Sequence, residues 1–417
     1  MMSAEMISIV ALGVMFVVAT VMPINIGILA FIASFIVGTA SLGLSEDEIF
    51  EGFPVELFVT IVGVTYLFSV ARRNGTIELL VQGGVKLVRG RVALIPWVLF
   101  GIAAVLTAFG TFTPAAVALL APIGMNFAYR FRINQLMIGM MVISGAHAGA
   151  FSPIAVSGAL VLGMLDHTSL HVAPYALFLA SFGFNLLLSV LTFLLLRRRN
   201  PASRPEPADV DEAGTAGSKI TWRQGLTLVA LVGLVVGALV FHLEIGFLAL
   251  AAGAVLTLLD MKNQAKATEG ISWSTILLVA GMVTYVGILE KAGTIDKISH
   301  GAAGMGAPLL VALLLCFAVA VTSAFASSTA ILTAIIPIAV PLLLGSHLSA
   351  VGLVAALAIS TTIVDTSPFS TNGALVLSNA RGVDRNRFYK QILVFTGGIV
   401  GAGPFLAWGL LVLPGML

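Results

Sequence analysis

Charged residues are scarce in this 417-residue chain, and cysteine is almost absent. Only 10% of the residues are Asp, Glu, Lys or Arg, whereas 59% are hydrophobic. Soluble domains carry about a quarter of their residues as charged groups, so the composition excludes a water-soluble globular fold. The single cysteine, Cys316, lies within an apolar run and excludes a disulfide framework. The chain therefore has the composition of a polytopic membrane protein.

Long apolar runs dominate the sequence instead. Most are close to the length of about 20 residues that a helix needs to cross a bilayer. No basic segment precedes the first run, so we expect a retained span and not a cleaved signal. The runs lie at 6–22, 25–43, 54–71, 90–109, 114–130, 133–158, 175–196, 222–242, 246–260, 274–292, 308–325, 328–345, 347–370 and 391–414.

A twelve-residue stretch occurs twice. Residues 151–162 return as residues 366–377, with seven identical positions at an offset of 215. In each copy a Ser-Pro pair, followed by a glycine, interrupts a long apolar run. Proline removes a backbone donor and breaks a helix, and glycine lets the backbone approach a neighbour closely. Either each Ser-Pro pair merely kinks a packed helix, or the duplicated break marks the binding site of a transporter.

Further matches extend the duplication along the chain. Residues 26–30, for example, match residues 245–249 at an offset of 219. Between the two copies lies a stretch rich in Pro, Ala, Gly and acidic residues, which cannot bury apolar area and is typical of a linker. We therefore divide the chain into a first repeat at 1–199, a cytoplasmic linker at 200–219 and a second repeat at 220–417.

In each half, only a few small or hydroxyl residues separate the fourth and fifth runs. These runs form either two full spans or one re-entrant hairpin, whose polar tip would need cover from protein or a water-filled cavity. With hairpins, each half has about five transmembrane helices plus one re-entrant hairpin and one broken helix. With full spans, each half has seven. Both numbers are odd, so the predicted fold class is an all-α polytopic membrane protein with an inverted-topology repeat.

The distribution of basic residues agrees with this topology. With the N-terminus outside, 19 of the 21 Lys and Arg residues fall on the inner side, where the positive-inside rule places them. Only Lys291 and Lys297 fall outside. We therefore expect a multi-pass protein of the cell membrane, the inner membrane of a bacterium, with both termini outside.

No Lys or Arg lies in the interior of any span, so no fixed cation is available at mid-membrane to bind an anion. A carboxylate substrate would need hydroxyl groups, exposed amides and the positive ends of half-helices. Alternatively, these hydroxyls bond only to carbonyls of their own helices. The hairpin tips and the two breaks supply the candidate substrate-binding residues, which are Thr111, Thr113, Ser152, Pro153, Ser157, Ser327, Ser328, Thr329, Ser367, Pro368, Thr371 and Asn372.

Asp365 is the acidic residue that we place deep in a span. A carboxylate there is costly, which indicates a cation ligand or a proton carrier; the alternative is a helix cap in an aqueous vestibule. His147 precedes the first break, where it either titrates near neutral pH or bonds a carbonyl freed by the break. Asn372 and Gly149 complete the candidate cation-coupling residues.

A sodium site is one form that cation coupling would take. Sodium is a hard cation and prefers oxygen ligands such as carboxylates, amides and hydroxyls. The residues that would supply them are Thr113, Ser328 and Asp365.

One stretch of the first half adds a resemblance to a known family. Residues 52–68, followed by Arg72-Arg73-Asn74-Gly75-Thr76, are similar to the MatC-type malonate and dicarboxylate carriers. The repeat architecture resembles the superfamily that holds the divalent anion:sodium symporters. In those symporters each hairpin tip carries a Ser-Asn-Thr signature for substrate and sodium. The tips here, at 112–114 and 327–329, differ from that signature and retain hydroxyls.

The patterns and the resemblance together favour a secondary active transporter. The resemblance implies a symporter of malonate or four-carbon dicarboxylates that works by alternating access and forms a homodimer. Na⁺ or H⁺ would be the coupling ion; the expected partners are a small anion and the lipid bilayer, with no nucleic acid and no other cofactor. The alternative is a proton-coupled or uncoupled transporter, or a channel, for citrate, sulfate or another oxyanion. An enzyme is not expected, because the sequence has no His-Glu-x-x-His motif and no activated Ser–His pair.

Overall fold

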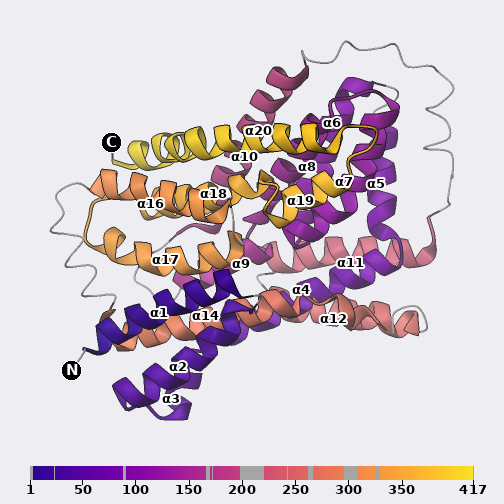
Figure 1. Ribbon diagram of the computed structural model, residues 1–417. Helices are drawn as coiled ribbons and strands as arrows, with labels where there is room; N and C mark the ends of the chain where they lie inside the picture. Colours follow the sequence, from indigo (N-terminus) through magenta and orange to yellow (C-terminus); the bar gives the residue numbers. More distant parts are fainter. Residues whose placement is uncertain are drawn as a thin grey trace.

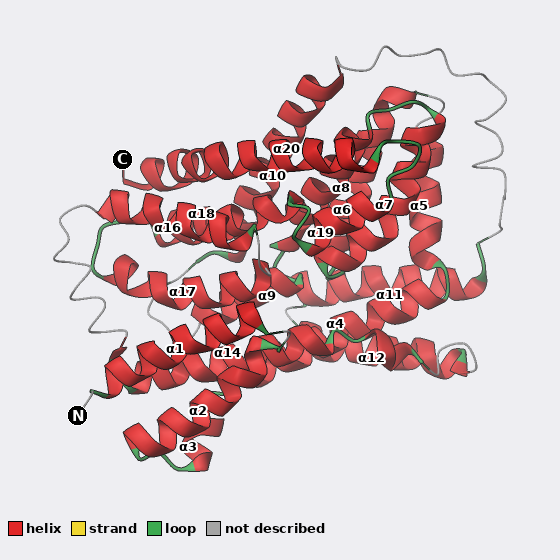
Figure 2. Cartoon of the chain, in the orientation of Figure 1, coloured by secondary structure: helices red, strands yellow, loops and turns green. Residues whose placement is uncertain are grey.

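The computed structural model describes residues 3–22, 24–87, 91–165, 170, 172–197, 220–241, 243–261, 266–294, 308–324 and 328–416. Within these ranges every regular element is helical and no strand occurs (Figure 2). The all-helical part of the predicted fold class is therefore confirmed. The predicted linker at 200–219 and the candidate residue Ser327 lie outside the described ranges.

The helices of the first half follow the predicted apolar runs, with two short additions, α3 and α5. They are α1 (Ala4–Val21), α2 (Ile26–Leu42), α3 (Glu46–Phe50), α4 (Val55–Arg73), α5 (Thr76–Leu87), α6 (Ile95–Ala108), α7 (Thr113–Arg130), α8 (Gln135–Ala150), α9 (Val156–Leu165) and α10 (Pro174–Arg197), with a 3₁₀ turn, η1 (Val92–Leu94), before α6.

The second half follows its own runs in the same way. Its elements are α11 (Trp222–Leu239), α12 (Ile245–Leu259), η3 (Ala267–Gly270), α14 (Trp273–Lys291), α16 (Pro308–Ser323), α17 (Ser328–Leu344), α18 (Ala350–Thr362), η4 (Ile363–Thr366), α19 (Thr371–Ser378) and α20 (Arg385–Ala407), followed by the turns η5 (Trp408–Val412) and η6 (Leu413–Met416).

Several of these helices are long and apolar enough to cross a bilayer. Five stretches meet that length and hydropathy, and shorter apolar helices accompany them. Their outer faces carry large apolar side chains in the open; Leu195 is 67% exposed and Val394 is 76% exposed. So much exposed apolar surface is typical of contact with lipid. The chain is a multi-pass membrane protein.

The helices form two units (Figure 1). The crossed-helix unit contains α1, α2, α4, α11, α12, η3 and α14, which lie along the lower part of the view. The hairpin unit contains α6 to α10 and α16 to α20, most of which lie above it; α9 and α17 lie at the height of α11 in this view. Each unit takes helices from both halves of the chain. As a result the two halves are interleaved and do not form separate lobes.

Glycines allow two close helix crossings in the crossed-helix unit. Where α2 meets α14, a Cβ on Gly281 would lie 2.0 Å from the carbonyl oxygen of Gly27. Where α4 meets α12, a Cβ on Gly63 would lie 2.2 Å from the carbonyl oxygen of Gly246. Small residues let helix backbones touch in a membrane, where packing replaces the hydrophobic effect. Each crossing joins one helix of the first half to one of the second.

A capping side chain stabilises each crossing at its end. Asn25 accepts a hydrogen bond from the Gly27 amide with Oδ1 and donates from Nδ2 to the carbonyl of Ser274, at 2.8 Å. Glu244 occupies the equivalent position in the second half, where it accepts from the Phe247 amide and from the hydroxyl of Thr60, the latter at 2.9 Å. Each cap satisfies a free helix amide and also joins the partner helix.

The broken helices occur at both predicted positions. α8 ends at Ala150 and α9 begins at Val156, while η4 ends at Thr366 and α19 begins at Thr371. The opposite orientation of the two halves, and the re-entrant nature of the α6–α7 and α16–α17 pairs, stay predictions.

We expect Gly281→Ala to destabilise the protein. Alanine normally favours a helix over glycine, but here its Cβ would collide with a backbone oxygen, and such overpacking costs about 1–3 kcal/mol. The measurement is the midpoint of thermal unfolding in detergent. Gly101→Ala in α6 is the matched control, because nothing lies within 4 Å of a Cβ at Gly101. Equal midpoints for the two variants would contradict the close crossing.

Candidate substrate and cation site

The N-termini of four helices meet at one cavity in the hairpin unit. We call it the central cavity; its volume is about 90 Å³. The first turns of α7, α9, α17 and α19 each bring a hydroxyl residue to its wall. A helix N-terminus presents unpaired amide donors and a partial positive charge. The residues that line it are Phe112, Thr113, Pro114, His147, Ser157, Ser328, Thr329, Leu332, Thr362, Asp365 and Thr371.

The two breaks have the same local construction. A Cβ on Gly158 would lie 2.1 Å from the carbonyl oxygen of Ser152, and a Cβ on Gly373 would lie 1.9 Å from that of Ser367. Since only glycine fits, each short helix begins directly beside the carbonyl of its break. The two glycines are equivalent positions of the repeated stretch, as are the two serines. The breaks therefore aim the N-termini of α9 and α19 at the cavity by equivalent means.

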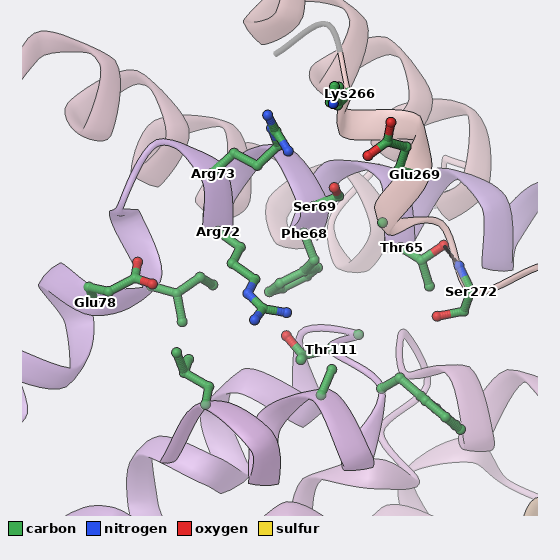
Figure 3. Close-up of a pocket in the computed structure, with 16 residues that line it drawn as sticks. Thr65, Phe68, Ser69, Arg72, Arg73, Glu78, Thr111, Lys266, Glu269 and Ser272 are labelled. Carbon is green, nitrogen blue, oxygen red and sulfur yellow. Dashed lines mark hydrogen bonds between the residues drawn. The ribbon is translucent and has the colours of Figure 1, made fainter. Parts of the chain in front are cut away.

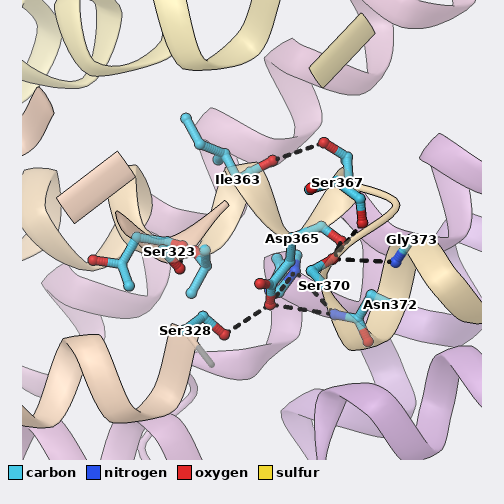
Figure 4. Close-up of polar contacts among 12 residues, drawn as sticks. Ser323, Ser328, Ile363, Asp365, Ser367, Ser370, Asn372 and Gly373 are labelled. Atoms are coloured by element: carbon cyan, nitrogen blue, oxygen red, sulfur yellow. Dashed lines mark hydrogen bonds and ion pairs between the residues drawn. The ribbon is translucent and has the colours of Figure 1, made fainter. Parts of the chain in front are cut away.

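Ser370 holds the second break together. Its hydroxyl donates to the carbonyl oxygen of Asp365 at 2.5 Å and lies 2.8 Å from that of Ser367. The hydroxyl oxygen of Ser370 also accepts a hydrogen bond from the amide of Gly373 at 3.3 Å, and this bond caps α19 (Figure 4). One side chain thus satisfies backbone groups on both sides of the break.

Three side chains surround the carboxylate of Asp365. Ser328 donates its hydroxyl to Oδ2 at 2.7 Å, and Asn372 donates from Nδ2 at 3.4 Å (Figure 4). Nε2 of His147 lies 3.6 Å from the same oxygen. Asp365 is only 6% exposed and His147 only 2%. The carboxylate is therefore buried and is the shared partner of α8, α17 and α19.

Two polar atoms beside this carboxylate have no hydrogen-bond partner among the described residues. They are Nδ1 of His147 and Oδ1 of Asn372, and both are buried. A buried polar atom without a partner costs about 1–3 kcal/mol. Such atoms are unusual in a protein interior unless a ligand, an ion or a water completes them. The site therefore has polar groups available for a ligand.

No lysine or arginine among the described residues compensates the buried carboxylate. The described residues that line the central cavity include no Lys and no Arg. Positive potential comes instead from the four helix N-termini, while the C-terminal turns of α8 and α18 bring partial negative charge close to Asp365. The cavity therefore combines a region suited to an anion with a region suited to a cation.

Seven of the residues predicted from the sequence line the central cavity. An eighth, Asn372, bonds the carboxylate of Asp365 and lies 3.5 Å from Nε2 of His147. The seven are Thr113, His147, Ser157, Ser328, Thr329, Asp365 and Thr371.

Other predicted residues lie elsewhere. Ser152, Pro153, Ser367 and Pro368 build the two breaks and do not line the cavity. A Cβ on Gly149 would lie 2.0 Å from the carbonyl oxygen of Ala104, so this glycine allows α8 to pack against α6.

Thr111 opens onto a different pocket, which we call the vestibule (Figure 3). The vestibule has a volume of about 410 Å³ and lies between the end of α4, the tip of the α6–α7 pair and η3. The prediction that Thr111 contributes to the same site as Thr113 therefore differs from the structure. The reason is the turn that follows α6, where Gly110 has a φ of 105°. This turn directs Thr111 and Thr113 into different pockets.

Five of the site's residues were not predicted from the sequence: Phe112, Pro114, Leu332 and Thr362 of the cavity wall, and Ser370 of the second break. Phe112 lines both pockets, and Thr362 lines the central cavity. The sequence did contain an indication for Thr362, because this residue is the repeat equivalent of His147 at the offset of 215. It contained an indication for Ser370 as well, since this residue lies inside the repeated stretch at 366–377. Phe112 stands in the predicted tip at 112–114, but as a phenylalanine it offers no polar group that would mark it as a binding residue.

Comparisons with known proteins place these features in context. Residues 2–150 match the family model described as the dicarboxylate carrier protein MatC N-terminus. No curated protein sequence matches the chain.

Among solved structures, the fold is similar to the YdaH transporter of Alcanivorax borkumensis, with a TM-score of 0.62 and 18% identity over 89% of this chain and 88% of that one. It is also similar to MtrF of Neisseria gonorrhoeae, with a TM-score of 0.59 and 12% identity over 89% of this chain and 84% of that one. At these identities the likeness concerns the fold. The resemblance to MatC-type dicarboxylate carriers, carried by residues 52–76, is confirmed by the family match over residues 2–150.

Proposed function

We propose that this protein is a cation-coupled symporter of small dicarboxylates such as malonate or four-carbon dicarboxylates. The observation that carries the proposal is the meeting of four helix N-termini at a cavity that also holds a buried carboxylate. The MatC match over residues 2–150 supports the substrate class. The similarity in fold to YdaH, described as a transporter, and to MtrF, described with a class of antimetabolite efflux pumps, supports transport over catalysis.

The central cavity suits a small anion. A water molecule needs about 10–15 Å³ of such space, so a volume of about 90 Å³ accommodates a solute of several heavy atoms. The hydroxyls of Thr113, Ser157 and Thr371 stand at three of the helix N-termini. Amides and hydroxyls of this kind bind carboxylates without a fixed cation.

The same cavity requires a cation. A dicarboxylate bound beside Asp365 would place several negative charges in a site with no Lys or Arg among the residues described. Like charges at short range repel strongly at low dielectric. A co-bound cation or proton removes that repulsion. Sodium would bind the oxygens of Thr113, Ser328 and Asp365, whereas a proton would be carried by the His147–Asp365 pair.

Ser328 would link the two binding events. A hydroxyl has one proton, and that of Ser328 is donated to Asp365 at 2.7 Å. A cation that neutralises Asp365 would release this proton for the substrate anion. Cation binding would therefore precede and strengthen anion binding.

Alternating access would move the hairpin unit against the crossed-helix unit. Every residue that lines the central cavity belongs to the hairpin unit. The equivalent breaks at an offset of 215 and the paired glycine crossings support an inverted repeat. We place the protein in the cell membrane, the inner membrane of a bacterium, with both termini outside and as a homodimer.

The second candidate is a proton-coupled or uncoupled transporter, or a channel, for another oxyanion such as citrate or sulfate. The close approach of His147 to Asp365 favours the proton-coupled form of this alternative. Uptake by proteoliposomes distinguishes the candidates. Radiolabelled malonate and succinate are tested with an inward sodium gradient, an inward proton gradient, or neither. Accumulation that needs one gradient identifies the symporter and its cation, whereas flux that never exceeds equilibrium contradicts symport.

We expect Asp365→Asn to abolish gradient-driven uptake while the protein still inserts and folds. The amide keeps the shape of the side chain but removes the charge that binds the cation. Initial uptake rates in proteoliposomes measure the effect, and size-exclusion chromatography checks folding. Asp384→Asn is the matched control, because Asp384 caps α20 and asparagine caps a helix equally well. Wild-type accumulation by Asp365→Asn would refute the role assigned to this carboxylate.

We expect His147→Gln to discriminate between the two coupling ions. Glutamine retains a donor for Asp365 but cannot carry a proton. With sodium coupling, uptake remains dependent on the sodium gradient; with proton coupling, uptake driven by a proton gradient disappears. His347→Gln is the control, since His347 is exposed and lies after α17. Proton-driven uptake that survives His147→Gln would exclude the His147–Asp365 pair as the carrier.

We expect Ser328→Ala to weaken the dependence of malonate binding on the cation. Removal of one hydrogen bond to a charged group costs about 1.5–3 kcal/mol, so the apparent dissociation constant for malonate should rise about tenfold or more at saturating cation. Isothermal titration with and without cation measures the change. Ser346→Ala is the control, because its hydroxyl donates to the backbone carbonyl of Leu342. An unchanged constant would place the substrate elsewhere.

A further inference from the structure

The vestibule is lined by both units of the protein. α4 and η3 contribute from the crossed-helix unit, and the tip of the α6–α7 pair contributes from the hairpin unit. The central cavity, by contrast, is lined by the hairpin unit alone. A pocket between two units changes shape whenever they move against each other. The vestibule is therefore placed where a transported solute would enter or leave.

A basic side chain without a partner projects into this space. The guanidinium of Arg72, in the last turn of α4, makes no hydrogen bond or ion pair within the described part of the chain, whereas its neighbour Arg73 has an interaction of its own. Figure 3 shows the guanidinium of Arg72 extending toward Thr111. An arginine presents several donors in a planar fork that matches a carboxylate. Arg72 is thus available for an anion.

Thr111 provides a second group at the same place. Its hydroxyl oxygen is buried and has no partner among the described residues. It faces the vestibule together with the guanidinium (Figure 3). A hydroxyl donor beside a free guanidinium would bind one carboxylate by both groups.

The charges of the vestibule favour an anion overall. Arg72, Arg73 and Lys266 outnumber Glu78 and Glu269 on its wall. Neither glutamate forms an ion pair with Arg72. This balance differs from that of the central cavity, whose described lining contains no Lys or Arg. A local excess of positive charge raises the concentration of anions at a pocket entrance.

Phe112 separates the two spaces. It is half-buried and lines both the vestibule and the central cavity. Its neighbours in the chain lie one on each side, Thr111 in the vestibule and Thr113 in the central cavity. An anion that leaves Arg72 for the helix N-termini would pass this ring.

From this juxtaposition we infer that the vestibule holds a second binding station for the substrate anion. Arg72 and Thr111 bind one of its carboxylates, and Phe112 is the barrier between this station and the central cavity. The inference rests on the proposed function, since it takes the substrate to be a small dicarboxylate. It adds a capture step in which a fixed cation binds the anion before the cation-dependent site receives it.

Protection of a single cysteine tests the station directly. The reporter is Ala115→Cys, on the vestibule wall, and the full-length protein is labelled in detergent with a charged maleimide. The native Cys316 is buried, so labelling of the unmodified protein measures the background. Malonate should slow the labelling of the reporter. Adding Arg72→Ala should raise the half-protecting malonate concentration about tenfold, as expected for the loss of a charge-assisted hydrogen bond.

Matched variants separate this station from its surroundings. Arg130→Ala removes an exposed arginine from the last turn of α7, outside the vestibule, and should leave protection unchanged. Asp365→Asn disables the central site and should also preserve protection. The inference would be overturned if malonate gave the reporter no protection in the otherwise unmodified vestibule. It would also be overturned if Arg72→Ala left the protection unchanged, or if Asp365→Asn abolished it. Failure of the proposed function is distinct, because it appears as absent uptake in proteoliposomes.

A second labelling experiment tests whether Phe112 is a barrier between the two pockets. A reporter cysteine at Thr329, in the central cavity, should be labelled faster when Phe112→Ala is added. Phe131→Ala, at the far end of α7 and outside both pockets, should leave the rate unchanged. Equal rates with and without Phe112→Ala would show that the ring is no barrier.

Discussion

The buried carboxylate of Asp365 constrains the whole hairpin unit. A charge at this depth in a membrane protein is costly unless other groups satisfy it. Its polar neighbours come from three different elements, with Ser328 on α17, Asn372 on α19 and His147 on α8. Satisfying the carboxylate therefore holds α17 against both breaks. The same contacts bring the N-termini of the helices around one cavity. The proposed anion site therefore depends on a carboxylate whose charge has the same sign as the anion.

The two units have different mechanical roles in the proposed transport cycle. Close glycine contacts at Gly27–Gly281 and Gly63–Gly246 leave the crossed-helix unit no room to slide internally. The central cavity is contained within the other unit, so its geometry survives a movement of one unit against the other. The vestibule would not survive such a movement unchanged, because its wall includes both Arg72 and Thr111. Motion would thus alter access to the site and leave its ligands in place.

Much of this site could be predicted from the sequence because its determinants are local. Proline and glycine break a helix wherever they stand, and a lone carboxylate such as Asp365 is conspicuous in an apolar run. Side-chain direction at the hairpin tip could not be predicted. Thr111 and Thr113 are close neighbours in the chain, yet the turn at Gly110 sends them into different pockets. A glycine beside a helix break, such as Gly149, is typical of a position where a ligand approaches the backbone. Only the packed structure reveals that Gly149 instead contacts α6.

Some residues of the site are equivalent in the two repeats, and others are not. Thr113 and Ser328 are equivalent at the offset of 215, as are Val156 and Thr371, so the helix N-termini come in equivalent pairs. Equivalent pairs can grip the two ends of a dicarboxylate, which is itself symmetric. The titratable groups break this pattern, because the position equivalent to Asp365 is Ala150 and the residue equivalent to His147 is Thr362. In the proposed mechanism, one carboxylate to one side of the pseudo-symmetric cavity would make anion binding conditional on a cation without offering two competing cation sites. In that proposal, duplication would account for recognition of the anion, and the later divergence of single residues would account for its coupling to the cation.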